Sequence, residues 1–354
     1  MEENARGKEG EWDERRNECD ICSVILFDMQ GTVVAVLRGG PSNEHDVSLR
    51  SGHSVLRNLS RERFTPRDIF IDKQGVWHER GLPTSPERIL PTVDVVIAPL
   101  HGPYGEGGGI QRLLEQFGVP YTGADSFHSY VSMHKVLSKE RAREAGLLTA
   151  KYAYIEPSTD VTSALTEVNR TFLQPVVVKP VSWGSSVGVS MTHGYAPTRQ
   201  AVEALLAEGA QGVLVEERIS GTEATVGVVD DFRGEKFYAL PPMEIVPPAS
   251  KEFFNFDAKY SGETREICPG RFTKKDTEEL MRAARLMHEA LNQRHYSRSD
   301  FIVSKRGIYY LETNNASAVG MTEESLFPKL LSATGVKLGD FLSHIIDLAM
   351  IKKS

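Results

Sequence analysis

Three side chains near the C-terminus carry the oxygen donors that divalent cations prefer. Asp300 begins a β-type run, and Glu312 and Asn314 end the next run, two residues apart and therefore on one face of a strand. A polar turn with glycine separates the two runs, 301–304 and 308–311, which predicts a hairpin that brings the three side chains together. Hard oxygen ligands without His or Cys favour Mg²⁺, which completes its shell with water and substrate phosphates. Acids at strand ends that only face solvent are the alternative interpretation.

A lysine beside a glycine- and serine-rich loop is a second candidate site. Lys179 follows three valines and precedes the loop 181–188, V-S-W-G-S-S-V-G. A cation next to several N–H and hydroxyl donors is typical of phosphate binding, whereas an edge-strand lysine that extends into solvent is the common alternative. Glu216 and Glu217 end a later β-type run, where they could accept hydrogen bonds from an adenine amino group or a ribose hydroxyl, or could face solvent.

Other segments could complete a ligand site. His101 comes just past an apolar run, and ligands gather at the carboxyl ends of strands in open parallel sheets, although a plain loop histidine also fits this position. The segment 105–114 places several glycines before a helix, so that free N–H groups could face an anion. The long loop 247–269 combines aromatic side chains with Lys259 and Tyr260, which suggests a lid.

Alternating strands and helices must position these residues. An apolar run, a glycine turn and an amphipathic helix that Ser42 could cap open an α/β unit near the N-terminus. The alternation continues along the chain and indicates an α/β protein. Strands are predicted at 32–37, 70–71, 93–99, 152–155, 175–180, 213–219 and 243–246, and helices at 111–117, 131–145, 277–292, 325–333 and 338–349.

The bulk composition narrows the class of protein. A chain of 354 residues suits two or three domains, and its 40% hydrophobic and 25% charged residues are typical of a globular protein. The net charge of -7 argues against a general nucleic-acid binder. No apolar run reaches the roughly 20 residues that span a bilayer, and the N-terminus carries charges of both signs, unlike a secretory signal.

The cysteines point to a reducing compartment. Three of them are too few for a disulfide framework, which fits the cytoplasm. Cys19 and Cys22 form a C-x-x-C pair, but no second Cys or His pair is near, so a complete zinc site is not expected. Residues 1–30 are interpreted as a tail or an extra strand outside the fold, in which only 21–27 is apolar enough to pack.

Six motifs, in order along about residues 32–350, resemble the D-alanine–D-alanine ligase family of the ATP-grasp superfamily. The resemblance implies an α/β fold with three-domain ATP-grasp architecture. An N-terminal open parallel-sheet domain would occupy 31–125, and central (126–230) and C-terminal (231–354) α+β domains would enclose ATP, the last one carrying the metal site and the lid. The motifs are G-G-P-S-N-E-H-D-V-S-L (39–49), L-H-G-P-Y-G-E (100–106), P-Y-T-G (120–123), V-K-P-V-S-W-G-S-S-V-G (178–188), D-A-K-Y (257–260) and D-F…L-E-T-N (300–314).

The same resemblance implies a function. ATP-dependent ligation of two D-alanines through an acyl phosphate would supply a peptidoglycan precursor in the cytoplasm. ATP would be the co-substrate, and two Mg²⁺ ions, with Mn²⁺ as a possible substitute, would be the cofactors. The partners implied are D-alanine, ATP and a second copy of the chain in a homodimer, with no nucleic acid and no membrane.

Site residues follow from the matching motif positions. The catalytic group would be Glu44, Ser185, Tyr260, Arg298 and the backbone N–H near Gly320. Substrate would contact Val47, His101, Ser325 and Leu326, the last two at a helix N-terminus that receives the second alanine's carboxylate. ATP would contact Lys135, Lys179, Ser186, Glu216, Glu217, Ile219, Glu223 and Lys259. The metal would be held by Asp300, Glu312 and Asn314.

This sequence departs from the family pattern at three points. The family has a compact N-x-x-P-G after the metal-binding asparagine, whereas 314–320 is longer and lacks the proline. Gly107 and His134 stand where acids are common, which lowers the negative charge near the expected nucleotide. Where the sequence matches the family, the resemblance implies that Tyr260 at the lid position favours an amine over a hydroxy acid as nucleophile. The alternatives are an ATP-grasp ligase for another pair of amino or hydroxy acids, and a nucleotide-binding homologue with impaired turnover.

Overall fold

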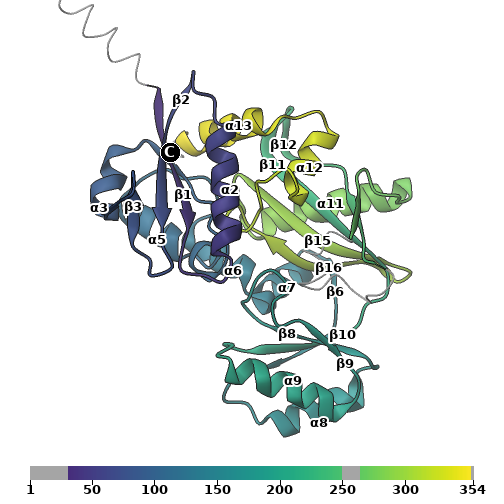
Figure 1. Ribbon diagram of the computed structural model, residues 1–354. Helices are drawn as coiled ribbons and strands as arrows, with labels where there is room; N and C mark the ends of the chain where they lie inside the picture. The colour runs from purple at the N-terminus through teal and green to yellow at the C-terminus, as the bar shows by residue number, and fades with distance from the viewer. Residues whose placement is uncertain (1–30, 249–263, 352–354) are drawn as a thin grey trace, which may run out of the picture.

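The computed structural model describes residues 31–248 and 264–351, and three sheets organise them (Figure 1). In the first sheet β1 pairs in parallel with β2 and β5, and β3 and β4 add an antiparallel edge. The interior strand β1 is buried on both faces, which explains why its sequence is a continuous apolar run. The order is β4-β3-β2-β1-β5, with bounds β1 (Thr32–Gly39), β2 (Phe64–Ile71), β3 (Trp77–Glu79), β4 (Leu82–Thr84) and β5 (Val95–Ile97).

The helix that follows β1 starts later than the sequence predicts. The helices of this first lobe are α2 (His45–Asn58), α3 (Pro86–Ile89), α4 (Pro103–Glu106) and α5 (Gly109–Gln116), with the 3-10 turn η1 (Leu90–Thr92). The cap predicted at Ser42 is wrong, because Glu44 is the N-cap of α2 and makes no side-chain capping bond. The Ser42 hydroxyl instead donates to the carbonyl oxygen of His101 at 2.8 Å and accepts from the Glu44 N–H at 3.1 Å. This turn fixes Glu44 beside the loop that follows β5.

A four-stranded antiparallel sheet with the order β7-β10-β8-β9 forms the lower part of the molecule in Figure 1. Helices α8 and α9 pack on one face of this sheet. Apolar residues of the helices and the sheet therefore form a separate hydrophobic core. The strands are β7 (Tyr152–Ile155), β8 (Val176–Pro180), β9 (Ser190–Thr192) and β10 (Val213–Glu217), and the helices are α8 (Val161–Thr171) and α9 (Tyr195–Ala207).

The largest sheet is seven-stranded, with the order β14-β13-β11-β15-β16-β6 and β12 paired to β11. Helix α11 packs on one face, and α12 and α13 pack on the other, where they share a core with β1 and α2 of the first lobe. The bounds are β6 (Leu148–Thr149), β11 (Thr222–Phe232), β12 (Glu235–Ala239), β13 (Met243–Val246), β14 (Arg265–Ile267), β15 (Tyr296–Ser304), β16 (Gly307–Asn314), α11 (Lys274–Ala290), α12 (Leu326–Ala333) and α13 (Leu338–Met350).

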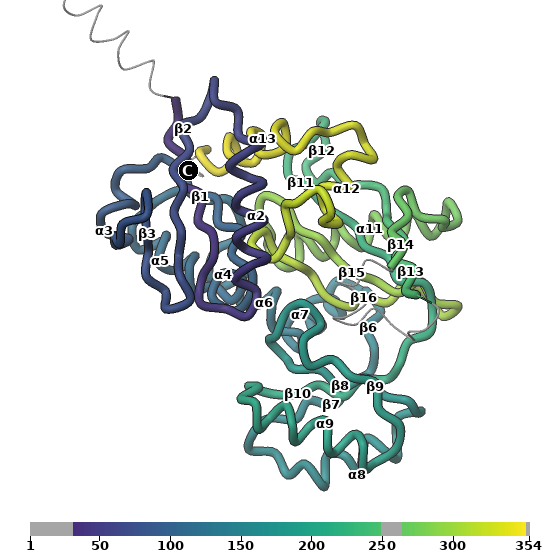
Figure 2. Tube along the Cα trace, viewed as in Figure 1, coloured from purple at the N-terminus to yellow at the C-terminus, as the bar shows by residue number. Residues whose placement is uncertain are grey.

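The helix predicted at 131–145 is two helices. α6 (Ser126–Met133) ends and α7 (Lys135–Glu144) begins at His134, whose backbone is extended with φ -80° and ψ 103°. The His134 ring accepts a hydrogen bond from the Leu137 N–H and so caps α7. The break puts Lys135 at the first position of a helix at the junction between the four-stranded sheet and the rest of the chain (Figure 2).

The sheets divide the chain differently from the predicted ranges. Within the predicted central range 126–230, only β7 to β10 form the four-stranded sheet. β6 and β11 belong to the seven-stranded sheet, and α7 packs against β16. The chain therefore leaves the large sheet after β6 and returns to it at β11. The domain boundaries themselves stay a prediction.

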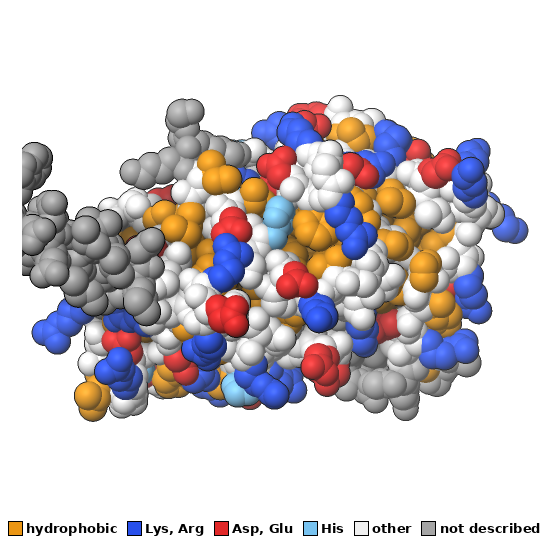
Figure 3. Space-filling model, turned by 90° about the horizontal axis from the view of Figure 1, so that it is seen from above, with side chains coloured by type: hydrophobic (Ala, Val, Ile, Leu, Met, Phe, Trp, Pro, Cys, Tyr) orange, Lys and Arg blue, Asp and Glu red, His pale blue; other side chains and the backbone are white. Residues whose placement is uncertain are grey.

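On the face shown in Figure 3, basic and acidic side chains are interspersed, with apolar groups between them. The C-terminal helix α13 is tied to the first lobe, because the Arg63 guanidinium donates to the carboxylate of Asp347 at 2.7 Å. Within 31–248 and 264–351, the structure has no helix of the length and apolar character that crossing a lipid bilayer requires.

Candidate active site

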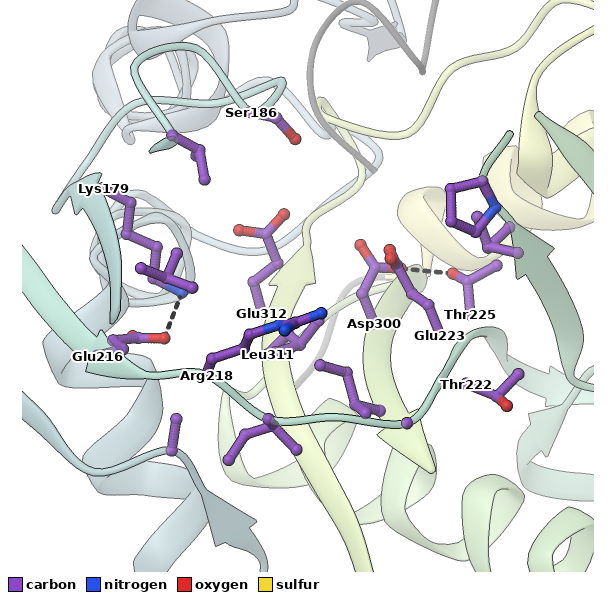
Figure 4. A pocket seen from close by; sticks show the side chains of 18 of the residues that line it. Lys179, Ser186, Glu216, Arg218, Thr222, Glu223, Thr225, Asp300, Leu311 and Glu312 are labelled. Carbon is purple, nitrogen blue, oxygen red and sulfur yellow. Dashed lines mark hydrogen bonds and ion pairs between the residues drawn. The ribbon is translucent and has the colours of Figure 1, made fainter. Parts of the chain in front are cut away.

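A cavity of about 430 Å³ lies between the four-stranded and the seven-stranded sheets. One part of its wall is apolar and the other part is charged, which suits a ligand with a flat apolar group and an anionic group. The apolar part includes Val177, Met191, Ile219, Ile302 and Leu311, and the charged part includes Lys135, Lys179, Glu216, Glu217, Glu223, Arg298, Asp300 and Glu312. Figure 4 shows side chains from both sheets around this opening.

Lys179 is a buried residue of the cavity wall. Its strand β8 lies between β10 and β9, so the alternative of an edge-strand lysine is excluded. The residue is 8% exposed, and its ammonium donates to Glu216 at 2.9 Å (Figure 4). Glu216 is itself buried, which excludes the solvent-facing alternative for that residue. A buried cation in a cavity wall is a site for an anionic group.

Lys135 extends a second ammonium group to the same wall. Its Nζ donates to the carbonyl oxygen of Trp183 at 2.7 Å and lies 3.6 Å from Glu312. Burial lowers the pKa of Lys135 below its ordinary value. The residue thus connects the start of α7 to the loop after β8 and to the end of β16.

The loop after β8 has an unusual backbone at the point where it borders the cavity. Ser185 and Ser186 both have positive φ, 50° and 57°, a conformation that non-glycine residues seldom adopt. Consecutive residues of this kind turn their N–H groups toward one concave side, which suits an anion. Ser186 lines the cavity. This loop therefore has the properties that the sequence predicted for phosphate binding.

The predicted hairpin is present, with one correction. β15 and β16 are antiparallel, Asp300 is opposite Glu312, and Arg298 is opposite Asn314. Asp300 lies in the middle of β15 and not at its start, because the strand begins at Tyr296. The Asn314 amide donates to Asp300 at 2.9 Å, and both Asp300 and Glu312 line the cavity.

A bulge in this hairpin changes which side chains reach the cavity. The register shifts between Asp300 and Phe301, so that Phe301 pairs with Tyr310 and leaves Leu311 without a partner. Leu311 and Glu312 consequently both line the cavity, although neighbours on a regular strand would point to opposite sides. An apolar contact and a carboxylate are thereby placed side by side.

Several donors orient the Asp300 carboxylate. The buried Arg298 guanidinium donates to both of its oxygens, at 3.1 and 2.9 Å, and the Thr225 hydroxyl donates at 2.5 Å. Burial alone would lower the pKa of Arg298, but the charge and hydrogen bonds of Asp300 raise it above its ordinary value. Arg298 is therefore a permanent cation beside the carboxylates.

The oxygen donors at this end of the cavity fit a hard divalent cation. Asp300 and Glu312 supply carboxylates that border the cavity, and the amide of Asn314 lies against Asp300. The set contains no sulfur or imidazole donor, which is the ligand chemistry of Mg²⁺. The neighbouring lysines, Lys135 and Lys179, attract phosphate oxygens, which could be further ligands of the cation.

A second polar cluster lies in the first lobe, beside the Ser185 loop. The Ser185 hydroxyl donates to Glu44, and the Glu106 carboxylate accepts from the Gly102 N–H at 2.8 Å. One oxygen of Glu44 and one of Glu106 converge near Gly184, where a Cβ would meet them at 3.4 and 3.3 Å. Two buried carboxylates that converge beside the backbone suit a small cation such as a primary ammonium group.

His101 belongs to this second cluster. Its Nε2 lies 3.1 Å from the Ser51 hydroxyl and its Nδ1 lies 3.9 Å from Glu106. Together, Glu44, His101 and Glu106 offer three ligand atoms within 4.8 Å of one another, so this is the second place where the described residues gather metal-binding groups. Val47, predicted to contact substrate, lies one turn into α2 from Glu44.

The long loop after β16 is held by the first lobe. The Asn315 amide donates to the backbone carbonyl of Glu106 at 2.8 Å, and its oxygen accepts from the Ala318 N–H at 3.2 Å. The Gln111 amide donates to Ser317 at 3.2 Å, and Tyr296 donates to the carbonyl of Ala316 at 2.9 Å. These bonds fix the loop without the proline that the family pattern contains.

The loop leads to the N-terminus of α12. Ser325 is the N-cap and makes no side-chain capping bond; its hydroxyl pairs with Thr322 at 2.9 Å. Leu326, the first residue of the helix, lines the cavity. A Cβ at Gly320 would lie 2.5 Å from the Ser325 hydroxyl, so a larger residue here would displace the Ser325 side chain. The helix N-terminus is a fitting place for a carboxylate.

Two predicted site residues cannot be placed, and some site residues were not predicted. Lys259 and Tyr260 lie outside the described residues. Glu217 lines the cavity but also accepts from the Lys151 N–H at 3.1 Å. Lys139 was not predicted as a site residue; its one signal in the sequence is its position one helical turn after Lys135. Thr225 was not predicted either, because no sequence pattern marks it as a neighbour of Asp300.

Comparison with known proteins gives consistent matches over most of the chain. Family models described as D-ala D-ala ligase N-terminus and C-terminus match residues 33–88 and 142–347. A D-alanine–D-alanine ligase of Syntrophobacter fumaroxidans is 38% identical over 325 residues, 90% of this chain and 97% of the relative. One of Geotalea uraniireducens is 36% identical over 323 residues, 91% and 96% of the two chains. The solved VanG D-Ala:D-Ser ligase of Enterococcus faecalis has a TM-score of 0.78 at 26% identity, over 90% of this chain and 100% of that one.

Proposed function

The chain belongs to the D-alanine–D-alanine ligase family, and we propose from this premise that it joins two D-alanines into D-alanyl-D-alanine with conversion of ATP to ADP and phosphate. This family supplies the dipeptide for peptidoglycan precursors and uses ATP with a divalent cation. The observation that carries the proposal is the adjacency of two sites: a cavity with two buried lysines and an oxygen-donor set, and a carboxylate cluster joined to it through the Ser185–Glu44 hydrogen bond.

In the first step, the carboxylate of one D-alanine attacks the γ-phosphorus of ATP. The reaction brings anions together, so the ammonium groups of Lys135 and Lys179 and the guanidinium of Arg298 offset their repulsion. Asp300, Glu312 and Asn314 would hold a divalent cation, which neutralises part of the phosphate charge when bound. The bond from γ-phosphorus to the bridging oxygen breaks, ADP leaves, and an acyl phosphate remains.

The first lobe orients this first D-alanine. Its ammonium group binds Glu44, which the Ser185 hydroxyl holds in place, and Glu106 adds a second carboxylate. His101 borders the same cluster. The carboxylate of the substrate is then directed toward the cavity where the phosphates bind. Water must be excluded at this stage because the acyl phosphate hydrolyses.

In the second step, the amine of the second D-alanine attacks the acyl carbon. Its carboxylate binds the N-terminus of α12 at Ser325 and Leu326, and its ammonium group must lose a proton before attack. A C–N bond forms, and the C–O bond to phosphate breaks with phosphate as leaving group. The tetrahedral oxyanion is stabilised by Arg298 and by the backbone N–H near Gly320.

Finer features of the proposal rest on the family resemblance. They are a pair of Mg²⁺ ions that Mn²⁺ could replace, a homodimer joined through the first domain, a cytoplasmic location, and the boundaries 1–30, 31–125, 126–230 and 231–354. Metal titration of the protein with an ATP analogue, and its mass in solution by light scattering, test the first two.

A different second substrate is the alternative that a specific observation favours. A solved relative of this fold is named as a D-Ala:D-Ser ligase. The N-terminus of α12 recognises a carboxylate, which D-serine and D-lactate carry as well. Specificity must therefore come from the side chains around the second substrate and not from the carboxylate site.

The test is a coupled assay of ADP release with D-alanine, L-alanine, D-serine and D-lactate, with products identified by mass spectrometry. We expect ADP release with D-alanine alone, in a one-to-one ratio to D-alanyl-D-alanine. ADP release that requires D-serine or D-lactate as second substrate would replace the proposal by the alternative. Magnesium-dependent ATP binding without any substrate-stimulated ADP release would contradict ligase activity altogether.

A further inference from the structure

Lys139 is a fully buried lysine directly behind the wall of the nucleotide cavity. It follows Lys135 by one turn of α7, its exposed fraction is 0%, and it is not among the side chains that line the cavity. Its Nζ lies 3.2 Å from Glu216. Within the described ranges 31–248 and 264–351, this ion pair is the one short polar contact of the Lys139 ammonium. Burying a charged group costs free energy unless an opposite charge compensates for it, and here that charge is Glu216.

Glu216 is held between two lysines. One carboxylate oxygen lies 2.9 Å from Lys179, which lines the cavity, and the other lies 3.2 Å from Lys139, which does not. Burial alone would raise the pKa of Glu216, but the charges of Lys139 and Lys179 lower it below its ordinary value. Glu216 therefore stays ionised because of these two neighbours.

When a phosphate binds in the cavity, Lys179 and Lys139 have different roles. A phosphate in the cavity competes with Glu216 for the single positive charge of Lys179, so its binding weakens the Lys179–Glu216 ion pair. Without a second cation, this exchange would leave a buried carboxylate uncompensated, which opposes binding. Lys139 cannot reach the cavity and therefore remains with Glu216 throughout.

We propose that Lys139 is a positioning residue for the nucleotide phosphates: it keeps Glu216 neutralised so that Lys179 is released from Glu216 to bind phosphate. The inference rests on the proposed use of the cavity for ATP. Burial lowers the pKa of Lys139 to about 8, so its ammonium is charged at neutral pH. The role is indirect, because Lys139 touches Glu216 and not the ligand.

The experiment compares nucleotides with and without phosphates. Lys139→Met removes the charge and keeps a similar length, whereas Lys139→Arg keeps the charge. Dissociation constants for a non-hydrolysable ATP analogue and for adenosine are measured by calorimetry, with thermal unfolding in parallel. The matched control is Lys236→Met, which removes a 72% exposed lysine of β12 that pairs with Glu289 of α11.

We expect Lys139→Met to weaken binding of the ATP analogue by about tenfold or more and to leave adenosine binding unchanged, because without a phosphate Lys179 stays on Glu216. Lys139→Arg should restore most of the affinity. Adding Glu216→Gln to Lys139→Met should also recover part of the affinity for the analogue, since the uncompensated carboxylate is gone.

A merely structural ion pair gives a different pattern. Lys139→Met would then lower the unfolding temperature and leave both dissociation constants unchanged, or weaken both equally, and either outcome overturns the inference. If Lys139→Met does not fold, Lys139→Gln replaces it: it also removes the charge but keeps a hydrogen-bond donor for Glu216, and the same two dissociation constants decide for or against the inference. Failure of the unmodified protein to bind the ATP analogue would instead contradict the proposed function, so the two failures are distinguishable.

Discussion

Both faces of the β15–β16 hairpin carry clusters of hydrogen-bonded polar side chains, but only one of the two clusters borders a cavity. On one face, Arg298, Asp300 and Glu312 border the cavity. On the other face, the His288 ring lies 2.7 Å from the Ser297 hydroxyl and 2.6 Å from Asp230. Serine, histidine and aspartate in this order have the connectivity of a nucleophile, a base and an orienting acid.

The difference between the faces is access. Ser297 and His288 have an exposed fraction of 0%, and neither lines the cavity between the two sheets. On that face, His288 of α11 makes its hydrogen bonds to two other protein side chains, Ser297 and Asp230. On the cavity face, the carboxylates are oriented by protein donors and also border open volume. A hydrogen-bonded constellation becomes a site only when a substrate can reach it.

Glu312→Gln should produce the largest effect on the cavity face. Replacing a carboxylate ligand by an amide weakens the divalent cation at the phosphates, so we expect kcat to fall by about 10³ or more. Steady-state kinetics with excess ATP and Mg²⁺ measure it, with Glu235→Gln on the exposed β12 as control. Near-normal turnover would remove Glu312 from its assigned role.

Arg298→Lys should have the next largest effect. Lysine keeps a charge but cannot donate to both Asp300 oxygens, and one stabilising donor at the oxyanion is lost or displaced. We expect kcat to fall by about 10² to 10³, with a smaller change in KM for ATP. Single-turnover measurement of dipeptide formation is the readout. A large rise of KM at constant kcat would assign Arg298 to ground-state binding only.

Asn315→Ala tests the loop that extends from the cavity face. Loss of the amide removes the bonds to Glu106 and Ala318 and loosens the segment that leads to Gly320. We expect kcat to fall by about tenfold and the ratio of ADP released to dipeptide formed to rise above one, as acyl phosphate is lost to water. The control is Asn169→Ala on the exposed side of α8. A ratio that stays at one would show that the loop does not protect the intermediate.

His288→Asn should have the smallest effect on catalysis. It breaks the buried bonds to Ser297 and Asp230, so the free energy of unfolding should fall by about 1–3 kcal/mol. The kcat of the folded enzyme should change by less than about twofold, because this face does not meet substrate. Chemical denaturation and kinetics on the same preparation provide both numbers. A collapse of kcat at unchanged stability would break the comparison between the two faces.

The local features of the site could be predicted from sequence because they depend on short-range rules. The β15–β16 hairpin follows from two β-type runs around a glycine turn, and the position of Lys179 before a glycine-serine loop follows from residue order. The strand β11 was missed because Gly227 and the two aspartates at 230–231 interrupt its apolar pattern. The break at His134 was missed because the periodicity of the apolar residues continues across it.

Relations across the fold could not be predicted. That Glu216 lies between Lys139 and Lys179 depends on where α7, which packs against β16 and β6, stands relative to β10, and no spacing in the sequence specifies this. The bulge beside Asp300 depends on the pairing of two strands. The positions of Glu44 and Ser185, far apart in sequence, were assigned correctly as neighbours only through the family resemblance.

The docking of the loop at 315–318 on the first lobe constrains how the protein can be re-engineered. Asn315 and Ser317 find their partners on Glu106, Ser132 and Gln111, so the loop and its receiving surface form one exchangeable unit. A shorter, proline-containing loop grafted from a relative would leave that surface with unmatched polar groups. Grafts that transfer both segments together should be tolerated, and grafts of either segment alone should not.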